Sequence, residues 1–79
     1  MKIQVLFFGA TADATGERAK RIDVLAGANA ATLVDVIASD HPALRRHKLL
    51  FAVNQQYVSA NTTLNDGDEL AIFTAVSGG

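Results

Sequence analysis

Two glycines, Gly78 and Gly79, end the sequence, and a C-terminal carboxylate is a group that can do chemistry. Glycine has no Cβ, so a chain that ends in glycine can pass through a narrow channel and take any φ. That freedom suits a carboxylate that is activated as an acyl adenylate inside another protein. Residues 75–79 span at most about 17 Å when extended, which is enough to reach a buried pocket. The alternative is an ordinary flexible terminus, where small residues are common.

Alternation along two predicted strands indicates a second feature, an apolar sheet face that the core does not use. The core-facing positions of residues 2–8 and 69–74 are Ile3, Val5, Phe7, Leu70 and Ile72. The positions expected to point away from the core are Leu6, Phe8 and Phe73, joined by Tyr57 from a short neighbouring strand. Exposed apolar patches of this kind usually mark a binding surface. The alternative is that the loop of residues 9–19 covers them.

Other polar groups indicate structure rather than chemistry. Asp66, Asp68 and Glu69 fall in a turn, whereas a calcium loop needs ligands spread over about twelve residues and ending in a bidentate glutamate. His41 and His47 have no partners at metal-ligand spacing. The sequence has no glycine-rich phosphate-binding loop. We therefore expect no metal and no cofactor on this chain, and any ATP chemistry should belong to a partner.

Charge and composition narrow the remaining classes of function. The net charge is −1, and the one dense basic stretch, residues 45–48, is expected to be a solvated helix end or loop. Nucleic-acid binding needs a positive face and is not expected. The absence of cysteine excludes disulfides, zinc–thiolate sites and cysteine nucleophiles. The longest strongly apolar run, residues 5–8, is too short for a membrane span or a signal peptide, so we expect a cytoplasmic protein.

Five strands and one main helix are expected to position these groups. Runs of β-branched and aromatic residues predict strands at residues 2–8, 20–25, 49–53, 56–59 and 69–74. Thr32 fits the N-cap of the helix, with Asp35 three residues on as a weaker capping box. Pro42 is expected to stop the helix at or near His41. Short helical turns are predicted near residues 11–14 and 43–47. The apolar stripe of the helix comprises Leu33, Val34, Val36, Ile37, Ala38 and His41.

The order strand, strand, helix, strand, short strand, strand favours an α+β fold of the β-grasp (ubiquitin-like) type. In that fold a mixed sheet packs on one main helix. A ferredoxin-like sandwich needs a second long helix, which the sequence lacks. Because 79 residues provide for one core, we expect one domain over residues 1–74 and a flexible diglycine tail over residues 75–79. Function should then lie on the surface, at a terminus or in a shared interface.

Several segments carry a likeness to a known family. They are residues 48–55, Val58-Ser59, residues 64–70 and Val76-Ser77-Gly78-Gly79, together with residues 5–8 followed by Gly16. In these segments the chain resembles the MoaD/ThiS sulfur-carrier family, most closely its molybdopterin-synthase branch. The resemblance covers nearly the whole chain. It is strong from Lys48 onward and loose over residues 9–42.

The resemblance implies a non-catalytic sulfur carrier of molybdenum cofactor biosynthesis. An E1-like (MoeB-like) enzyme would use ATP to adenylate the Gly79 carboxylate, and a sulfur donor would convert it to a thiocarboxylate (1-thioglycine). The tail would then enter the large (MoaE-like) subunit of a heterotetrameric molybdopterin synthase, with Ala75, Val76 and Ser77 inserted. There the sulfur would pass to cyclic pyranopterin monophosphate, so catalysis would belong to the partner subunit.

The resemblance also assigns Phe8, Tyr57 and Phe73 to the surface that docks the partners. Family members usually have two prolines where this chain has Thr74 and Ala75, so this tail should be less stiff. That departure bears on the pathway more than on the carrier role. Three alternatives stay open: a carrier for thiamine or another thiocarboxylate pathway, a ubiquitin-like protein modifier, and a plain β-grasp interaction domain.

Overall fold

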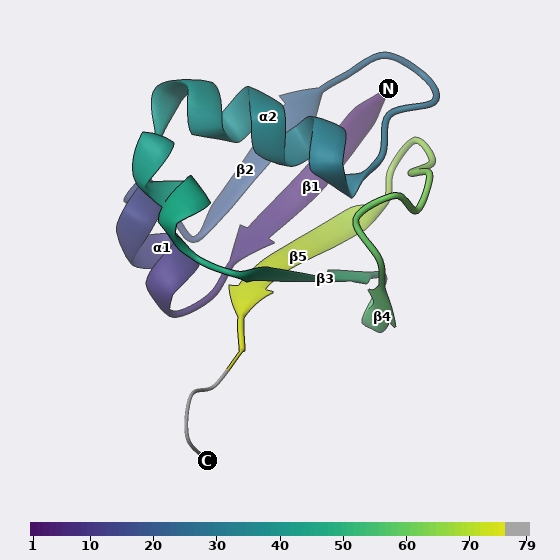
Figure 1. Ribbon diagram of the computed structural model, residues 1–79. Coiled ribbons are helices and arrows are strands. Elements are labelled where there is room, and N and C mark those ends of the chain that lie inside the picture. The colour runs from purple at the N-terminus through teal and green to yellow at the C-terminus, as the bar shows by residue number, and fades with distance from the viewer. Residues whose placement is uncertain (76–79) are drawn as a thin grey trace.

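The computed structural model describes residues 1–75, in which helices pack on one face of a mixed five-stranded sheet (Figure 1). The elements are β1 (Lys2–Phe7), α1 (Ala10–Thr15), β2 (Ala19–Asp23), α2 (Ala30–Asp40), the 3-10 helix η1 (Pro42–Arg46), β3 (Leu49–Val53), β4 (Gln56–Val58) and β5 (Glu69–Thr74). Every predicted strand and helical turn is present, with ends that differ from the prediction by up to two residues. No helix among residues 1–75 has the length and apolar character needed to cross a membrane.

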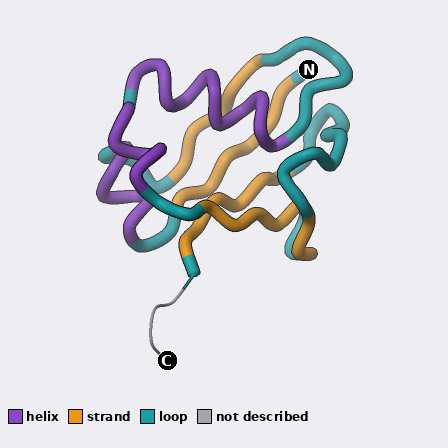
Figure 2. Tube along the Cα trace, viewed as in Figure 1, coloured by secondary structure: helices purple, strands orange, loops and turns teal. Residues whose placement is uncertain are grey.

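The strands lie in the order β2-β1-β5-β3-β4. β1 and β5 are parallel neighbours at the centre of the sheet, and the other neighbouring pairs are antiparallel. The first and last strands of the chain therefore lie side by side, as the orange strands of Figure 2 show. This mixed sheet under one main helix is the β-grasp arrangement predicted from the order of the elements.

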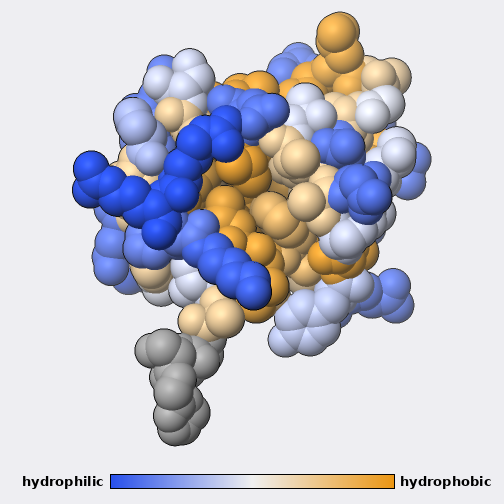
Figure 3. Space-filling model, in the orientation of Figure 1, coloured by the Kyte–Doolittle hydropathy of each residue, from blue (hydrophilic) through white to orange (hydrophobic). Residues whose placement is uncertain are grey.

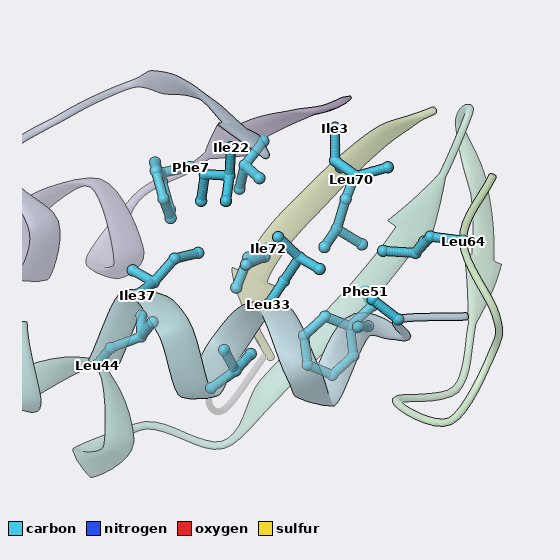
Figure 4. Close-up of a cluster of buried hydrophobic side chains, with 14 residues drawn as sticks. Ile3, Phe7, Ile22, Leu33, Ile37, Leu44, Phe51, Leu64, Leu70 and Ile72 are labelled. Carbon is cyan, nitrogen blue, oxygen red and sulfur yellow. The ribbon is translucent and has the colours of Figure 1, made fainter. Parts of the chain in front are cut away.

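The core lies between α2 and the sheet (Figure 4). As the alternation predicts, β1 and β5 turn their core positions inward, and none of these side chains is more than 2% exposed: Ile3, Val5, Phe7, Leu70 and Ile72. α2 meets them with Leu33 and Ile37, because residues four apart share one face of a helix. Alternate residues of the strands are thereby left for the opposite face of the sheet.

The N-terminus of α2 differs from the prediction. Asn29, rather than Thr32, is the N-cap: its side chain accepts a hydrogen bond from the Thr32 N–H at 2.9 Å. The Thr32 hydroxyl accepts one from the Asn29 N–H at 3.3 Å, which completes a capping box. Asn and Thr both favour the N-cap, and Asn is the stronger of the two. Asn29 is extended and forms an isolated bridge with Thr63, so the helix starts after it. Asp35 takes no part in the cap.

The apolar stripe of α2 is also displaced from the prediction. Its buried residues are Ala30, Leu33, Val34, Ile37 and Ala38. Val36 lies beyond the edge of this stripe and is 45% exposed. His41 is the C-cap of α2, and Pro42 begins η1, which confirms the predicted stop. Leu44 anchors η1 by its complete burial in the core.

The turn between β3 and β4 depends on two residues with positive φ, Asn54 at 49° and Gln55 at 71°. Two-residue hairpin loops of this type favour glycine at the second position. The Asn54 side chain donates to Asp68 Oδ1 and accepts from the Glu69 N–H, both at 3.0 Å. The turn is thereby fastened to the start of β5.

We expect Gln55→Gly to stabilise the protein. A left-handed backbone costs a residue with a Cβ about 1–2 kcal/mol, whereas glycine loses about 0.5–1 kcal/mol through its unfolded-state entropy. The free energy of unfolding should therefore rise by about 0.5–1 kcal/mol, measurable by urea denaturation. Gln56→Gly is the matched control. Gln56 lies in β4, where glycine should lower the free energy of unfolding of the protein. A urea midpoint for Gln55→Gly below that of the unchanged protein would show that the positive φ of Gln55 costs no stability.

Candidate functional site

The sheet face turned away from α2, which we call the outer face, carries the apolar residues predicted there. Phe8 is 52% exposed and Tyr57 is 84% exposed. Leu6 and Phe73 are half-buried, and Leu50, which pairs with Phe73, shares their face. The loop of residues 9–19 therefore leaves Phe8 and Tyr57 open to solvent, and the alternative in which it covers them is wrong.

The strand register brings Tyr57 and Phe73 together. Their ring centroids are 5.7 Å apart and the ring planes are tilted by 55°, a geometry that aromatic pairs favour. Ala52 pairs with Tyr57 on one side and with Ala71 on the other. These small side chains leave room on the outer face for the tyrosine ring to lean towards Phe73.

Phe8 lies on the other side of Phe73, between two shallow hollows. One hollow, of about 370 Å³, is lined by Phe8, Gly9, Phe73 and Thr74. The other, of about 510 Å³, extends from Phe8 towards α1 and includes Leu6, Asp13 and Arg18 in its lining. Open hollows beside exposed aromatic rings suit the side chains of a protein partner better than an enclosed small molecule. The structure thus brings Phe8, Tyr57 and Phe73 onto one surface, and their docking role stays a prediction.

Thr11, to which the sequence pattern assigns no role, holds Phe8 in place. It is fully buried, and its hydroxyl accepts a hydrogen bond from the Phe8 N–H at 3.0 Å. The same oxygen lies 2.7 Å from the Ile72 carbonyl oxygen and 2.9 Å from that of Phe8, and can donate to either. Thr11 therefore joins the start of α1 to β5 next to Phe73. Its position between Gly9 and Gly16 is the only signal that the sequence offers.

The chain leaves the sheet beside this surface. β5 ends at Thr74, which pairs with Leu49 at the start of β3. Ala75 follows and is exposed. The other residues of the predicted tail, Val76, Ser77, Gly78 and Gly79, lie outside the described residues, so the division into a domain and a tail stays a prediction. Thr74 occupies a ladder position at which a proline would offer no N–H.

The acidic turn serves the fold, as predicted. Asp66 Oδ1 accepts a hydrogen bond from the Lys2 N–H at 2.7 Å, and Asp68 Oδ2 accepts one from the Asn65 N–H at 2.8 Å. Asp68 Oδ1 accepts the bond from Asn54 described above. In the described part of the chain, no cluster of three or more His, Asp or Glu side chains forms a candidate metal site.

Comparison with known proteins gives one family and several relatives. The model of the ThiS family matches residues 5–79. The molybdopterin synthase sulfur carrier subunit of Mycobacterium tuberculosis is 38% identical, over 100% of this chain and 99% of its own length. The human protein of the same name is 36% identical, over 99% of this chain and 94% of its own length.

Solved structures share the fold along nearly the whole chain. A putative molybdopterin converting factor subunit 1 from Pyrococcus furiosus has a TM-score of 0.86 at 26% identity, covering 96% of this chain and 99% of that one. The small archaeal modifier protein 1 of Haloferax volcanii has a TM-score of 0.83 at 26% identity, with 95% and 98% covered. One chain in a complex of subunits 1 and 2 of the molybdopterin-converting factor of Helicobacter pylori has a TM-score of 0.68 at 26% identity. The match covers 100% of this chain and 100% of that one. These likenesses confirm the ubiquitin-like β-grasp fold.

Replacing Thr11 with valine should destabilise the protein by about 1–3 kcal/mol, the usual cost of leaving buried hydrogen-bonding groups without a partner. The change keeps the shape of the side chain but removes the hydroxyl shared by Phe8 and Ile72. Thr63→Val is the control, since Thr63 is exposed and its side chain makes no hydrogen bond within residues 1–75. Equal urea midpoints for the two variants would show that the Thr11 hydroxyl does not matter.

Proposed function

The chain belongs to the ThiS family, and we propose that within this family it is the sulfur carrier subunit of a molybdopterin synthase. The observation that carries the proposal is the full-length likeness to the bacterial and human proteins that bear this name. The family match extends to Gly79, the residue whose carboxylate would carry the sulfur.

In this role the chain is a substrate of one partner and a sulfur donor to another. An E1-like (MoeB-like) enzyme adenylates the Gly79 carboxylate with ATP and releases pyrophosphate. A sulfur donor then displaces AMP, and one carboxylate oxygen is replaced by sulfur. The large (MoaE-like) subunit takes up the tail and catalyses transfer of the sulfur to cyclic pyranopterin monophosphate. We propose a cytoplasmic location, where ATP for this activation is available.

The arrangement of the outer face supports this role. Tyr57 and Phe73 are in contact, and Phe8 shares a hollow with Phe73 next to the last residue of β5. Large aromatic side chains carry much of the binding energy at protein interfaces. A partner seated on these rings would border the base of the tail. Residues 75–79 could then reach up to about 17 Å into that partner. The solved complex of subunits 1 and 2 of the Helicobacter pylori molybdopterin-converting factor supports a role in which this chain binds a second subunit.

A ubiquitin-like protein modifier is the second candidate, favoured by the likeness to the small archaeal modifier protein 1. Both functions begin with the same activated carboxylate. They differ in the product, which is a thiocarboxylate for the carrier and an isopeptide bond to a lysine for the modifier. A carrier for thiamine or another thiocarboxylate pathway differs only in the acceptor of the sulfur.

Incubation with the cognate activating enzyme, ATP and a sulfur source should replace one oxygen of this chain by sulfur. Intact-mass spectrometry measures the change, and deletion of Gly79 should abolish it. An unchanged mass for the full chain would contradict a sulfur-carrier role in any pathway. Higher-mass conjugates that depend on Gly79 would favour the modifier.

Tyr57→Ala should weaken binding to the large subunit at least about tenfold, which corresponds to about 1.4 kcal/mol. Tyr57 is 84% exposed but its ring contacts Phe73, so the free chain should lose only about 0.5–1.5 kcal/mol of stability and stay folded. Leu25→Ala is the matched control, because Leu25 is 87% exposed but lies in the loop between β2 and α2. Isothermal titration calorimetry measures both affinities. Similar losses for the two variants would argue against the outer face as the docking surface.

A further inference from the structure

Four consecutive exposed residues form a second surface feature, which we call the basic patch: Arg45, Arg46, His47 and Lys48. The patch is held by its neighbours on both sides. Leu44 before it is fully buried, and β3 begins directly after it at Leu49. Three of the seven Lys and Arg residues of the chain lie in this short stretch. Because the net charge of the whole chain is −1, the patch is a local concentration of positive charge.

The basic patch lies at the base of the tail. Leu49 pairs with Thr74, so Lys48 and Ala75 follow directly beyond the last pair of the β3–β5 ladder. Lys48 comes two residues before Leu50, which pairs with Phe73 of the outer face. The patch is therefore continuous with the outer face. Figure 3 shows strongly hydrophilic side chains gathered on the side of the molecule where β5 ends.

Most of this positive charge is not neutralised within the described residues. Arg45 forms an exposed ion pair with Asp35 of α2. The other ion pairs among residues 1–75 join Met1 to Asp23 and Lys20 to Glu17, so Arg46 and Lys48 take part in none. Arg46 and His47 line an open hollow against α1, which Asp13 shares outside ion-pair distance. Within residues 1–75, the patch thus presents two cations, Arg46 and Lys48, that form no ion pair.

We propose that the basic patch binds carboxylates of the second subunit of the synthase, at the rim of the site that receives the tail. This inference rests on the proposed function and specifies the chemistry of the partner surface. Residues 75–79 reach at most about 17 Å, so when Gly79 is in a buried active site, the base of the tail lies against the rim of that site. The patch borders that base, and the rim is therefore the surface that it meets.

Exposed cations in this position act mainly on the rate of encounter. Complementary charges steer association and raise the association rate, and the effect falls as salt screens it. The apolar outer face supplies most of the affinity, since exposed ion pairs contribute little. The basic patch would orient the carrier so that the tail faces the opening of the second subunit's site at the first encounter.

The test uses the full chain and the cognate second subunit, with association rates measured by stopped flow from low to high salt. The variant is Arg46→Glu combined with Lys48→Glu. At low salt its association rate should be at least about tenfold below that of the unchanged chain, and the two rates should converge at high salt. The matched control combines Lys2→Glu with Arg21→Glu, which makes the same charge change at the opposite end of β1.

The outcomes separate this inference from the function on which it rests. If the unchanged chain binds the second subunit but the Arg46 and Lys48 changes leave the rate and its salt dependence intact, the patch proposal is overturned and the carrier role stands. An equal loss in the control also overturns it. If the unchanged chain does not bind, both proposals fail. Patch-dependent retention of a short nucleic-acid duplex, with unaltered subunit kinetics, would overturn the inference in favour of a nucleic-acid surface.

Discussion

The parallel pairing of β1 with β5 is the contact on which the rest of the structure depends. It joins the first strand of the chain to the last, so Val5 lies opposite Leu70 and Phe7 opposite Ile72 in the centre of the sheet. Their side chains form the floor of the core under α2. The same pairing carries Phe8 to the side of Phe73 and lets Thr11 reach the Ile72 carbonyl. Core and candidate site are thus two faces of one ladder.

Much of this could be predicted from the sequence, because burial imposes a simple period on strands. Alternation alone assigns Ile3, Val5 and Phe7 to the core and leaves Phe8 outside, and the structure agrees. The end of α2 was equally predictable, since Pro42 restricts the residue before it. These features depend on neighbours in the sequence, which a reader of the sequence can see.

The features that could not be predicted depend on distant contacts. Asn29, the N-cap of α2, is extended and forms a bridge with the distant Thr63, a contact that local N-cap preferences do not reveal. Thr11 acquires its role only because β5 passes beside α1. The basic patch, seen in the sequence, has the composition of an ordinary solvated loop. The pairing of Leu49 with Thr74 is what places it at the base of the tail.

The central position of β5 has a mechanical consequence. β5 is hydrogen-bonded to β1 on one side and to β3 on the other, and the tail continues directly from its end. A force along the tail, such as its withdrawal from a tight channel, therefore loads two ladders at once and in shear, so that many hydrogen bonds must break together. An edge strand would instead peel away one bond at a time. The sheet should therefore stay intact when a partner pulls on the tail.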